Sequence, residues 1–185
     1  MLDEIVSKYL KLHPEERDDL MQLILQIANE DELNNRKTMP GHVTGSAIVL
    51  SEDRSQLLII HHKFLDMWLQ PGGHWEPDEP DPWTAAQREA EEETGVQIAE
   101  MLPANSEDPR IPFDINSHPI PEQADKNEPA HVHHDFRYIF IAKDDDLTSQ
   151  EAEVHAAAFV DFDDPRTEHV RPIIEKLIEQ GIIAA

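Results

Sequence analysis

The sequence predicts an α/β/α sandwich that carries a helical extension at its N-terminus. From residue 43 onward, strand-like segments are followed by one helix, further strands and a closing helix. The chain has 185 residues, which is enough to bury one sizeable core with an appendage. We therefore expect residues 1–36 to form the extension and residues 37–185 to form the main domain.

The extension is expected to contain two short amphipathic helices and a polar linker. Residues 2–12 carry apolar side chains at helical spacing, and a second helix is expected to begin near Pro14, a favoured first-turn residue. Residues 29–37 are polar and form the linker. Two short helices cannot bury their apolar stripes alone. We expect them to pack on the main domain, and pairing with a second subunit in a homodimer is the alternative.

The main domain begins with a predicted hairpin, residues 43–50 and 57–60, joined by the turn at residues 51–55. A helix is expected over residues 83–94, where Ala85, Ala86 and Ala90 are small enough to let it lie close to a sheet. The remaining expected elements are a long Pro-rich loop over 103–130 with strand character at 111–115, strands over 132–142 and 156–162, and a closing helix over 167–180.

Charge and composition exclude several classes of protein. The 39 acidic and 15 basic residues leave a formal charge of -24, which repels nucleic-acid backbones and argues against long DNA or RNA as a partner. The absence of cysteine excludes disulfides, thiolate nucleophiles and Cys-type zinc sites. No apolar run approaches the ~20 residues that span a bilayer, and the first residues lack a basic stretch. We therefore expect no membrane partner and a cytoplasmic location.

The most informative segment runs from Gly73 to Val96. It places Glu79 six residues after Gly73 and ends in Arg88-Glu-Ala-Glu-Glu-Glu-Thr-Gly-Val96. Within it, Glu89, Glu92 and Glu93 stand at i, i+3 and i+4, so a helix would place the three carboxylates on one face. Divalent cations would relieve their mutual repulsion, because hard cations prefer oxygen ligands. A solvated acidic helix face is the alternative interpretation.

This segment resembles the signature of the Nudix hydrolases, G-x5-E-x7-R-E-U-x-E-E-x-G-U, where U is a bulky aliphatic residue. The chain departs from it twice: eight residues separate Glu79 from Arg88, and Ala90 stands at a bulky position. The extra residue falls in the Pro80-Asp81-Pro82 turn, where an insertion costs little. The preceding residues 69–73 also match the strand-to-loop transition that is common in the family.

The resemblance implies an α/β/α sandwich with a mixed sheet and metal-dependent hydrolysis of a diphosphate linkage by water. The implied cofactor is Mg²⁺ or Mn²⁺, and the implied metal ligands are the backbone carbonyl of Gly72 and the carboxylates of Glu89, Glu92 and Glu93. The implied substrate is a small nucleotide-like pyrophosphate, such as ADP-ribose, a dinucleoside polyphosphate or a modified nucleoside triphosphate. A Nudix-fold sensor that binds a nucleotide without hydrolysing it is the competing interpretation.

The resemblance also gives roles to residues around the ligands. Arg88 is expected to orient Glu89, and Glu79 to hold Arg88. The general base is open between Glu89 itself and Glu153, which lies just before the strand predicted over residues 156–162.

A second cluster of chemically active residues is the run from His131 to Tyr138. Strand alternation would place His131, His133 and Asp135 on one face and His134 on the other. Such a face suits either a zinc site or the wall of a substrate pocket. His61 ends another predicted strand near Gly73 and is, with His131 and His133, a candidate for substrate binding.

Overall fold

A single mixed sheet forms the middle layer of the protein. The structure, a computed structural model, describes residues 1–103, 108–123, 128–148 and 154–184. Within these ranges the sheet has eight strands in the order β3-β2-β1-β7-β5, with β4 paired to β1, β6 to β7 and β8 to β2. The strands are β1 Gly41–Leu50, β2 Gln56–His62, β3 Met67–Leu69, β4 Gly72–His74, β5 Ile98–Leu102, β6 Asp114–Ile120, β7 His131–Ala142 and β8 Val154–Asp161.

The two long central strands are parallel, whereas every other pairing in the sheet is antiparallel. Strands β1 and β7 stay in register from Gly41 opposite Val132 to Leu50 opposite Ile141. The predicted hairpin of β1 and β2 is present, but its strands pair only at Leu50 and Leu57 before they diverge. This divergence leaves β1 free to pair with β4.

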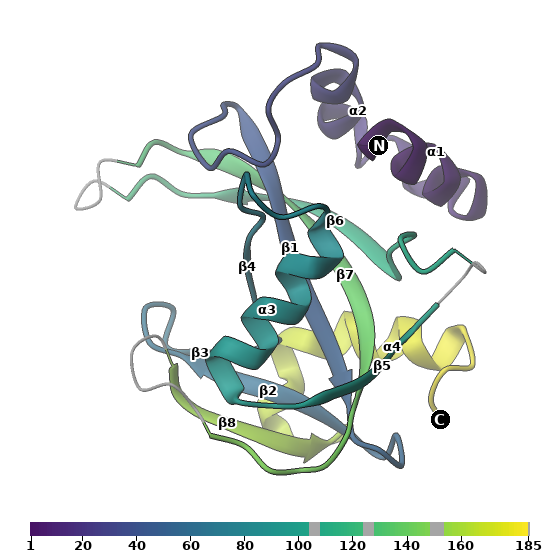
Figure 1. Ribbon diagram of the computed structural model, residues 1–185, viewed down its shortest axis with the longest axis vertical. Helices are drawn as coiled ribbons and strands as arrows, with labels where there is room; N and C mark the ends of the chain where they lie inside the picture. Colours follow the sequence, from purple (N-terminus) through teal and green to yellow (C-terminus); the bar gives the residue numbers. More distant parts are fainter. Residues whose placement is uncertain (104–107, 124–127, 149–153, 185) are drawn as a thin grey trace.

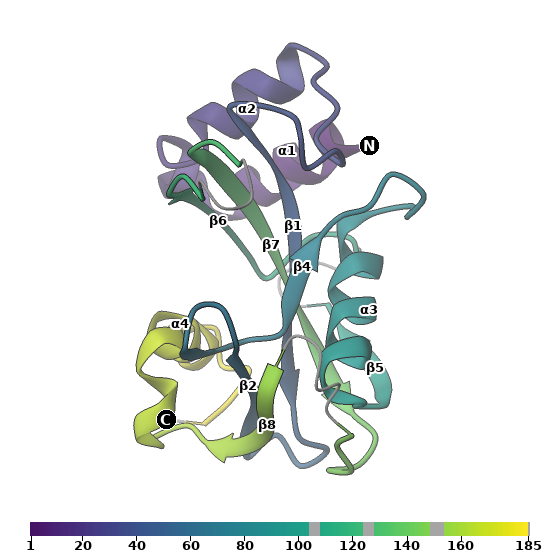
Figure 2. The ribbon, with the colours of Figure 1, turned by 90° about the vertical axis from the view of Figure 1, so that its left-hand side faces the viewer.

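Helices cover both faces of the sheet, which confirms the predicted α/β fold. The helices are α1 Leu2–Leu12, α2 Met21–Ala28, α3 Pro82–Thr94 and α4 Arg171–Glu179. Helices α3 and α4 lie on opposite sides of the strands, and α1 and α2 lie beyond the end where β1 begins (Figures 1 and 2). No helix within the described ranges is both long enough and apolar enough to span a bilayer.

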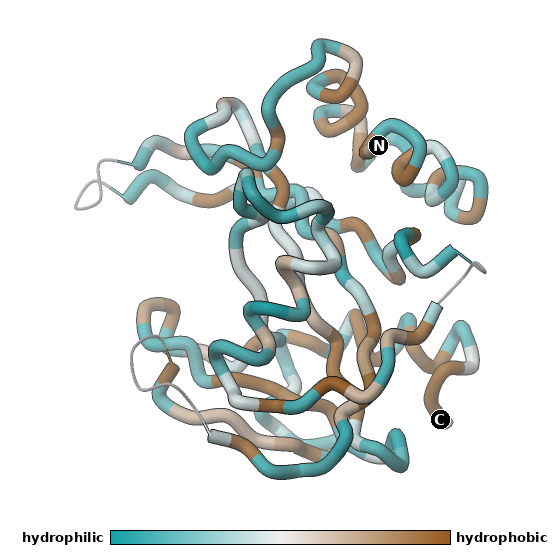
Figure 3. The backbone as a smooth tube through the Cα atoms, viewed as in Figure 1, coloured by the Kyte–Doolittle hydropathy of each residue, from teal (hydrophilic) through white to brown (hydrophobic). Residues whose placement is uncertain are grey.

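Side-chain alternation along β1 divides the core into two clusters. Val43, Ala47 and Val49 belong to a cluster with the alanines of α3, whereas Ile48 and Leu50 belong to a cluster with the apolar side of α4. Apolar residues are concentrated in the strands and the loops are mostly hydrophilic (Figure 3). Both faces of β1 are therefore buried, as expected for a parallel strand at the centre of a sheet.

Helix α3 is held in place by its own ends and by small residues. The side chain of Asp81 caps its N-terminus by accepting a hydrogen bond from the Thr84 N–H at 3.1 Å. Gly95 ends the helix with φ of 70°, a left-handed conformation that glycine adopts without strain. Gly45 of β1 lies so near the backbone of α3 that a Cβ there would overlap the Pro82 carbonyl oxygen.

The N-terminal helices pack directly on the rest of the chain. Ile5, Val6, Leu20 and Leu23 are buried in the same core cluster as α3. The hydroxyl of the buried Tyr9 accepts a hydrogen bond from the Ile115 N–H at 3.2 Å. This packing agrees with the first of the two roles expected for these helices.

Two predicted helices begin later than expected. Residues 14–17 form a 3₁₀ turn, and the α-helix starts only at Met21. In that turn Glu16 is held by Tyr9 and Lys176, and the chain then turns before the helix begins. The closing helix likewise starts at Arg171, after a 3₁₀ segment over Pro165–Val170. Pro172 explains this start, because proline is tolerated in the first turn of a helix and not in its interior.

The loop predicted over residues 103–130 contains strand β6, Asp114–Ile120, which begins within the expected strand character at 111–115 and extends beyond it. The prolines of this segment are typical of a loop, which is why a loop was expected. Strand β6 pairs only with β7 and lies at an edge, where Pro119 is tolerated. Strand β5 was also missed. It is short, and Ala99 and Glu100 are exposed, so it lacks the buried apolar alternation that marks a strand.

Candidate functional site

The carboxylates of α3 face the two glycines of strand β4. Glu93 is buried, and its Oε2 accepts a hydrogen bond from the Gly72 N–H at 3.1 Å. Gly73 passes so close to Glu89 that a Cβ at this position would overlap the carboxylate. The absence of a side chain at residue 73 therefore allows the acidic face of the helix to approach the strand, whereas a Cβ at Gly72 would overlap Ser46 of β1.

Arg88 donates hydrogen bonds to three carboxylates around the site. Its Nε donates to Glu79 Oε1 at 2.7 Å, and its Nη1 donates to Glu89 Oε1 at 2.8 Å and to Glu92 Oε2 at 3.1 Å. Its Nη2 donates to the backbone carbonyl of His74 at 3.1 Å. The hydrogen bond with Glu79 is the main cause that raises the pKa of Arg88 above its ordinary value, so the guanidinium stays charged.

The Glu79–Arg88 pair forms despite the extra residue between them. Glu79 Oε2 accepts the Glu76 N–H at 2.8 Å, and the Glu79 carbonyl accepts the Trp75 indole N–H at 3.1 Å. These two bonds fix Glu79 before the chain reaches Asp81. The additional residue is absorbed by the turn that leads into α3.

The donor set at this place suits a hard divalent cation. The carboxylates of Glu89, Glu92 and Glu93 and the carbonyl of Gly72 offer oxygen atoms, which Mg²⁺ and Mn²⁺ prefer. The side chain of Glu92 is 56% exposed, whereas that of Glu89 is 14% exposed. The space beside the Glu89 carboxylate, which a Cβ at Gly73 would fill, brings the backbone of β4 close to the carboxylates.

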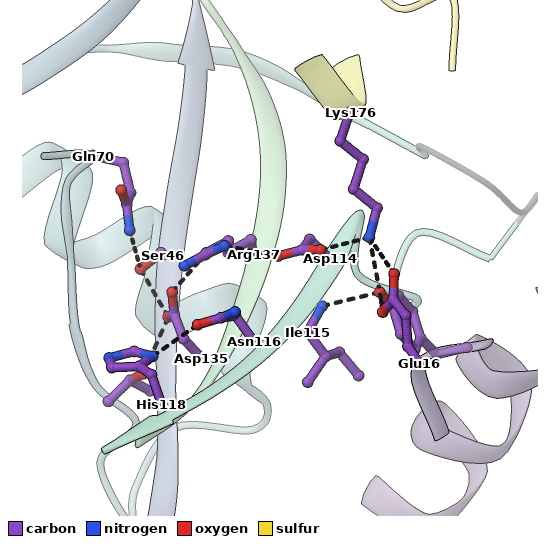
Figure 4. A network of polar contacts seen from close by, with 12 residues as sticks. Glu16, Ser46, Gln70, Asp114, Ile115, Asn116, His118, Asp135, Arg137 and Lys176 are labelled. Atoms are coloured by element: carbon purple, nitrogen blue, oxygen red, sulfur yellow. Dashed lines mark hydrogen bonds and ion pairs between the residues drawn. The ribbon is translucent and has the colours of Figure 1, made fainter. Parts of the chain in front are cut away.

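A buried polar network runs across the sheet on the side covered by α4 (Figure 4). Arg137 donates to Asp135 at 2.9 Å and to Asp114 at 2.8 Å, and Lys176 of α4 reaches the other oxygen of Asp114. Ser46 donates to Asp135 at 2.8 Å. Burial disfavours the charge of Arg137, but the two aspartates outweigh it and raise its pKa.

The patterns in the sequence did not predict that these polar residues form one network. Its signal is the presence of polar residues at alternate positions of two otherwise apolar strands, Thr44 and Ser46 in β1 and Asp135 and Arg137 in β7. A half-exposed strand gives the same alternation. Only the pairing of β1 with β7 shows that these residues lie on one buried face.

The histidines of β7 are divided between the faces of the sheet as alternation predicted. His131 Nε2 lies 3.1 Å from His133 Nε2, whereas His134 contacts Gln26 of α2 at 3.0 Å on the other face. The structure adds His42 of β1, which is opposite His133 in the ladder, and His74 of β4. The ring centroids of His42 and His133 are 4.9 Å apart, and those of His74 and His133 are 5.3 Å apart.

Burial and mutual repulsion favour the neutral forms of His133 and His74. Burial is the largest cause that lowers the pKa of His133 to about 2 and that of His74 to about 4, and neighbouring histidines add to the effect. Asp135, which alternation grouped with His131 and His133, is engaged elsewhere, because it accepts hydrogen bonds from Thr44, Ser46 and Arg137.

His61 does not join these groups. The His61 ring stacks on Trp68 with centroids 5.1 Å apart, and its Nε2 lies 3.1 Å from Asp66. Strand β2 carries His61, and β1 separates this strand from β7 in the sheet. Glu153 lies outside the described residues.

Comparison with known proteins gives a consistent result. A family model described as the NUDIX domain matches residues 41–180. A curated relative from Lactococcus lactis subsp. cremoris, named as a probable DHNTP pyrophosphohydrolase, is 30% identical over 161 residues, which cover 86% of this chain and 87% of the relative.

Solved structures share the fold. A NUDIX-family hydrolase from Clostridium perfringens aligns with a TM-score of 0.55 at 19% identity, covering 76% of this chain and 97% of that one. A MutT NUDIX hydrolase from Burkholderia pseudomallei aligns with a TM-score of 0.51 at 20% identity, covering 74% of this chain and 98% of that one.

Proposed function

The chain belongs to the Nudix hydrolase family, and on this premise we propose that it hydrolyses a pyrophosphate bond in a small nucleoside-diphosphate-linked substrate. In this proposal water attacks phosphorus, and Mg²⁺ or Mn²⁺ is bound by Glu89, Glu92, Glu93 and the carbonyl of Gly72. The observation that carries the proposal is the contact of the α3 carboxylates with the glycines of β4. A divalent ion bound there would neutralise the pyrophosphate, polarise the attacked phosphorus and lower the pKa of a bound water.

Each residue around the carboxylates has a separate task in this proposal. Glu79 holds Arg88, and Arg88 fixes Glu89 and Glu92 through one shared nitrogen. In this proposal Arg88 is a positioning residue, because its guanidinium holds the carboxylates of Glu89 and Glu92. Glu153 and Glu89 are the two candidates for the general base. An unchanged acidic limb in the pH–rate profile of Glu153→Gln would exclude Glu153.

The polar face of the sheet is the proposed substrate-binding surface. Gly72 pairs with Ser46, the polar network continues from Ser46 to Asp135, and the histidines extend the same face toward the start of β1. His131 and His133 are retained as substrate-binding candidates on this surface. His61 is retained as a separate candidate near β3.

Substrate hydrolysis can be tested with a panel of compounds. The name of the Lactococcus relative makes DHNTP the first compound, followed by ADP-ribose, a dinucleoside polyphosphate and modified nucleoside triphosphates. Product release is measured with Mg²⁺ or Mn²⁺ for the wild type, Glu92→Gln and Glu91→Gln. Glu91 is a matched control, because it is exposed on the same helix and its side chain bonds only to Gln87 in the described contacts.

The expected result is turnover of one compound that falls at least about 100-fold in Glu92→Gln and stays within about twofold in Glu91→Gln. Equal loss in both variants would contradict the metal-ligand assignment. Tight nucleotide binding without turnover of any compound would instead favour the sensor interpretation.

We also propose a cytoplasmic location and a division of the chain at residues 36 and 37. A homodimer formed through the N-terminal helices is part of the same proposal, since Leu12, Met21 and Leu25 expose large apolar side chains there. Sedimentation of the chain with and without residues 1–36 would test it. If the full and the shortened chain have the same oligomeric state, dimerisation is not the purpose of the helices.

A further inference from the structure

We propose that His42, His131 and His133 form a binding site for a transition-metal ion of the zinc class, separate from the carboxylate site of α3. The three side chains each offer one ligand nitrogen, and these nitrogens all lie within 4.8 Å of one another. Imidazole nitrogen suits Zn²⁺ and Co²⁺, whereas Mg²⁺ prefers oxygen. The two metal sites are therefore expected to select different ions.

The hydrogen bonds of the rings favour ligand nitrogens directed at a shared ion. His131 Nδ1 donates to the Pro129 carbonyl at 2.8 Å, which leaves the lone pair on Nε2. His42 Nδ1 makes a longer contact of the same kind with the Thr38 carbonyl at 3.4 Å. A backbone carbonyl behind the distal ring nitrogen is the usual arrangement for a metal-binding histidine, because it fixes both the tautomer and the ring orientation.

The distance between His131 Nε2 and His133 Nε2 also fits two nitrogen ligands of one Zn²⁺ ion. These atoms are 3.1 Å apart. Two nitrogens at about 2.0–2.1 Å from a tetrahedral Zn²⁺ lie about 3.3 Å from each other. A hydrogen bond between the rings would give a similar distance, so this pair alone does not identify a metal site.

Buried ring nitrogens without a hydrogen-bond partner favour a shared metal ion over a hydrogen bond between the rings alone. His42 is 1% exposed, and its Nε2 is buried with no hydrogen-bond partner among the described residues. The same is true of Nε2 of His74, whose ring lies against those of His42 and His133. Buried polar atoms are almost always paired, and an ion would supply the missing partner for a lone pair.

The electrostatic surroundings permit a cation. Arg36 and Glu128 both act on His42 and form an ion pair at 3.3 Å, so their charges largely cancel.

The position of the cluster indicates what the ion would do. His42 is near the start of β1, and His131 and His133 are at the start of β7, so one ion would join the first residues of the two parallel strands. These strands are far apart in the sequence, and the ion would close the long loop between them. It would also lie on the same face as Thr44 and Asp135.

Metal binding to the full-length protein tests the proposal without an assay of hydrolysis. The protein is stripped with a chelator and titrated with Co²⁺ in excess Mg²⁺, which occupies the oxygen-ligand site. The visible absorption of Co²⁺ reports nitrogen ligation, and competition with Zn²⁺ gives the zinc affinity. We expect one equivalent of tightly bound metal and a higher Tm in its presence.

Two variants test the ligand assignment and two serve as controls. His133→Ala and His131→Gln are expected to weaken binding by more than about 100-fold, because loss of a partner outside the ligand set alone costs about 10- to 100-fold. His169→Ala is the histidine control, since His169 is exposed on the 3₁₀ segment after β8. Glu92→Gln is expected to bind Zn²⁺ as the wild type does.

Wild-type protein that binds no Co²⁺ or Zn²⁺ in excess Mg²⁺ would overturn the proposal, and this result does not depend on the folding of any variant. Full affinity in folded His133→Ala would do the same. Loss of binding in Glu92→Gln would place the ion at the carboxylates instead.

Discussion

Replacement of Arg88 by lysine keeps the positive charge but removes the planar arrangement of hydrogen-bond donors. Arg88 makes contacts with three carboxylates and one backbone carbonyl, at 2.7 and 3.4 Å to Glu79, 2.8 Å to Glu89, 3.1 Å to Glu92 and 3.1 Å to His74. A lysine ammonium has three donors around one point and cannot reproduce a planar fork. We expect Arg88→Lys to keep the contact with one carboxylate and to release the others.

The expected losses of stability and activity in Arg88→Lys follow from the number of these contacts and from their exposure to solvent. A hydrogen bond to a charged group contributes about 1.5–3 kcal/mol when it is buried. The side chain of Arg88 is 30% exposed, so solvent weakens each contact and we expect a loss of about 1–2 kcal/mol in the free energy of unfolding. Because Glu89 would lose its orientation, kcat/KM should fall about 10- to 100-fold, equivalent to about 1.4–2.7 kcal/mol.

Steady-state rates at varied substrate and Mg²⁺ concentrations test this prediction, with urea unfolding of the same samples. A positioning role predicts that the apparent affinity for Mg²⁺ falls together with kcat, whereas a purely stabilising role changes only the unfolding curve. Arg110→Lys is the control, because Arg110 makes a similar two-nitrogen contact with Asp108 at the surface. Unchanged kcat/KM and metal affinity in Arg88→Lys would refute the reasoning.

Three further predictions concern packing and protonation. Gly73→Ala should lower kcat/KM by about 100-fold or more in the substrate assay, because its methyl group would displace the Glu89 carboxylate. Lys176→Met should reduce the free energy of unfolding by about 3 kcal/mol in urea, since it leaves Asp114, whose side chain is only 14% exposed, without one of its two cationic partners. Burial lowers the pKa of His134 to about 4. An unfolded histidine titrates near pH 6.5, so this group stabilises the fold above that pH. The contribution should disappear by about 1.4 kcal/mol per unit as the pH of metal-free protein falls from 6.5 toward 4. Denaturation at several pH values should show a flatter dependence in His134→Gln.

Helix α3 and its surroundings show how much local sequence can predict. The cap at Asp81, the stop at Gly95 and the small Ala85, Ala86 and Ala90 act over a few residues, so their effects can be recognised in one segment. The carboxylates at i, i+3 and i+4 share a face for the same reason. Their contact with Gly72 and Gly73 could be expected only from the family resemblance.

Elements defined by distant partners were the ones predicted poorly. Strand β6 lies at an edge beside β7, and this neighbour makes a Pro-containing segment into a strand. The start of α4 is an exception, because it depends on Pro172, which is a local signal in the sequence.

Local patterns in the sequence predict that the chain is an α/β protein, where its helix of carboxylates begins and ends, and which family it resembles. These properties follow from caps, periodicity and spacing, which act between residues a few positions apart. Only the tertiary structure decided that His42 lies beside His131 and His133 and that Ser46 lies beside Asp135. About ninety residues separate the members of these pairs, and their contact is created by the parallel register of β1 and β7, which no local pattern encodes.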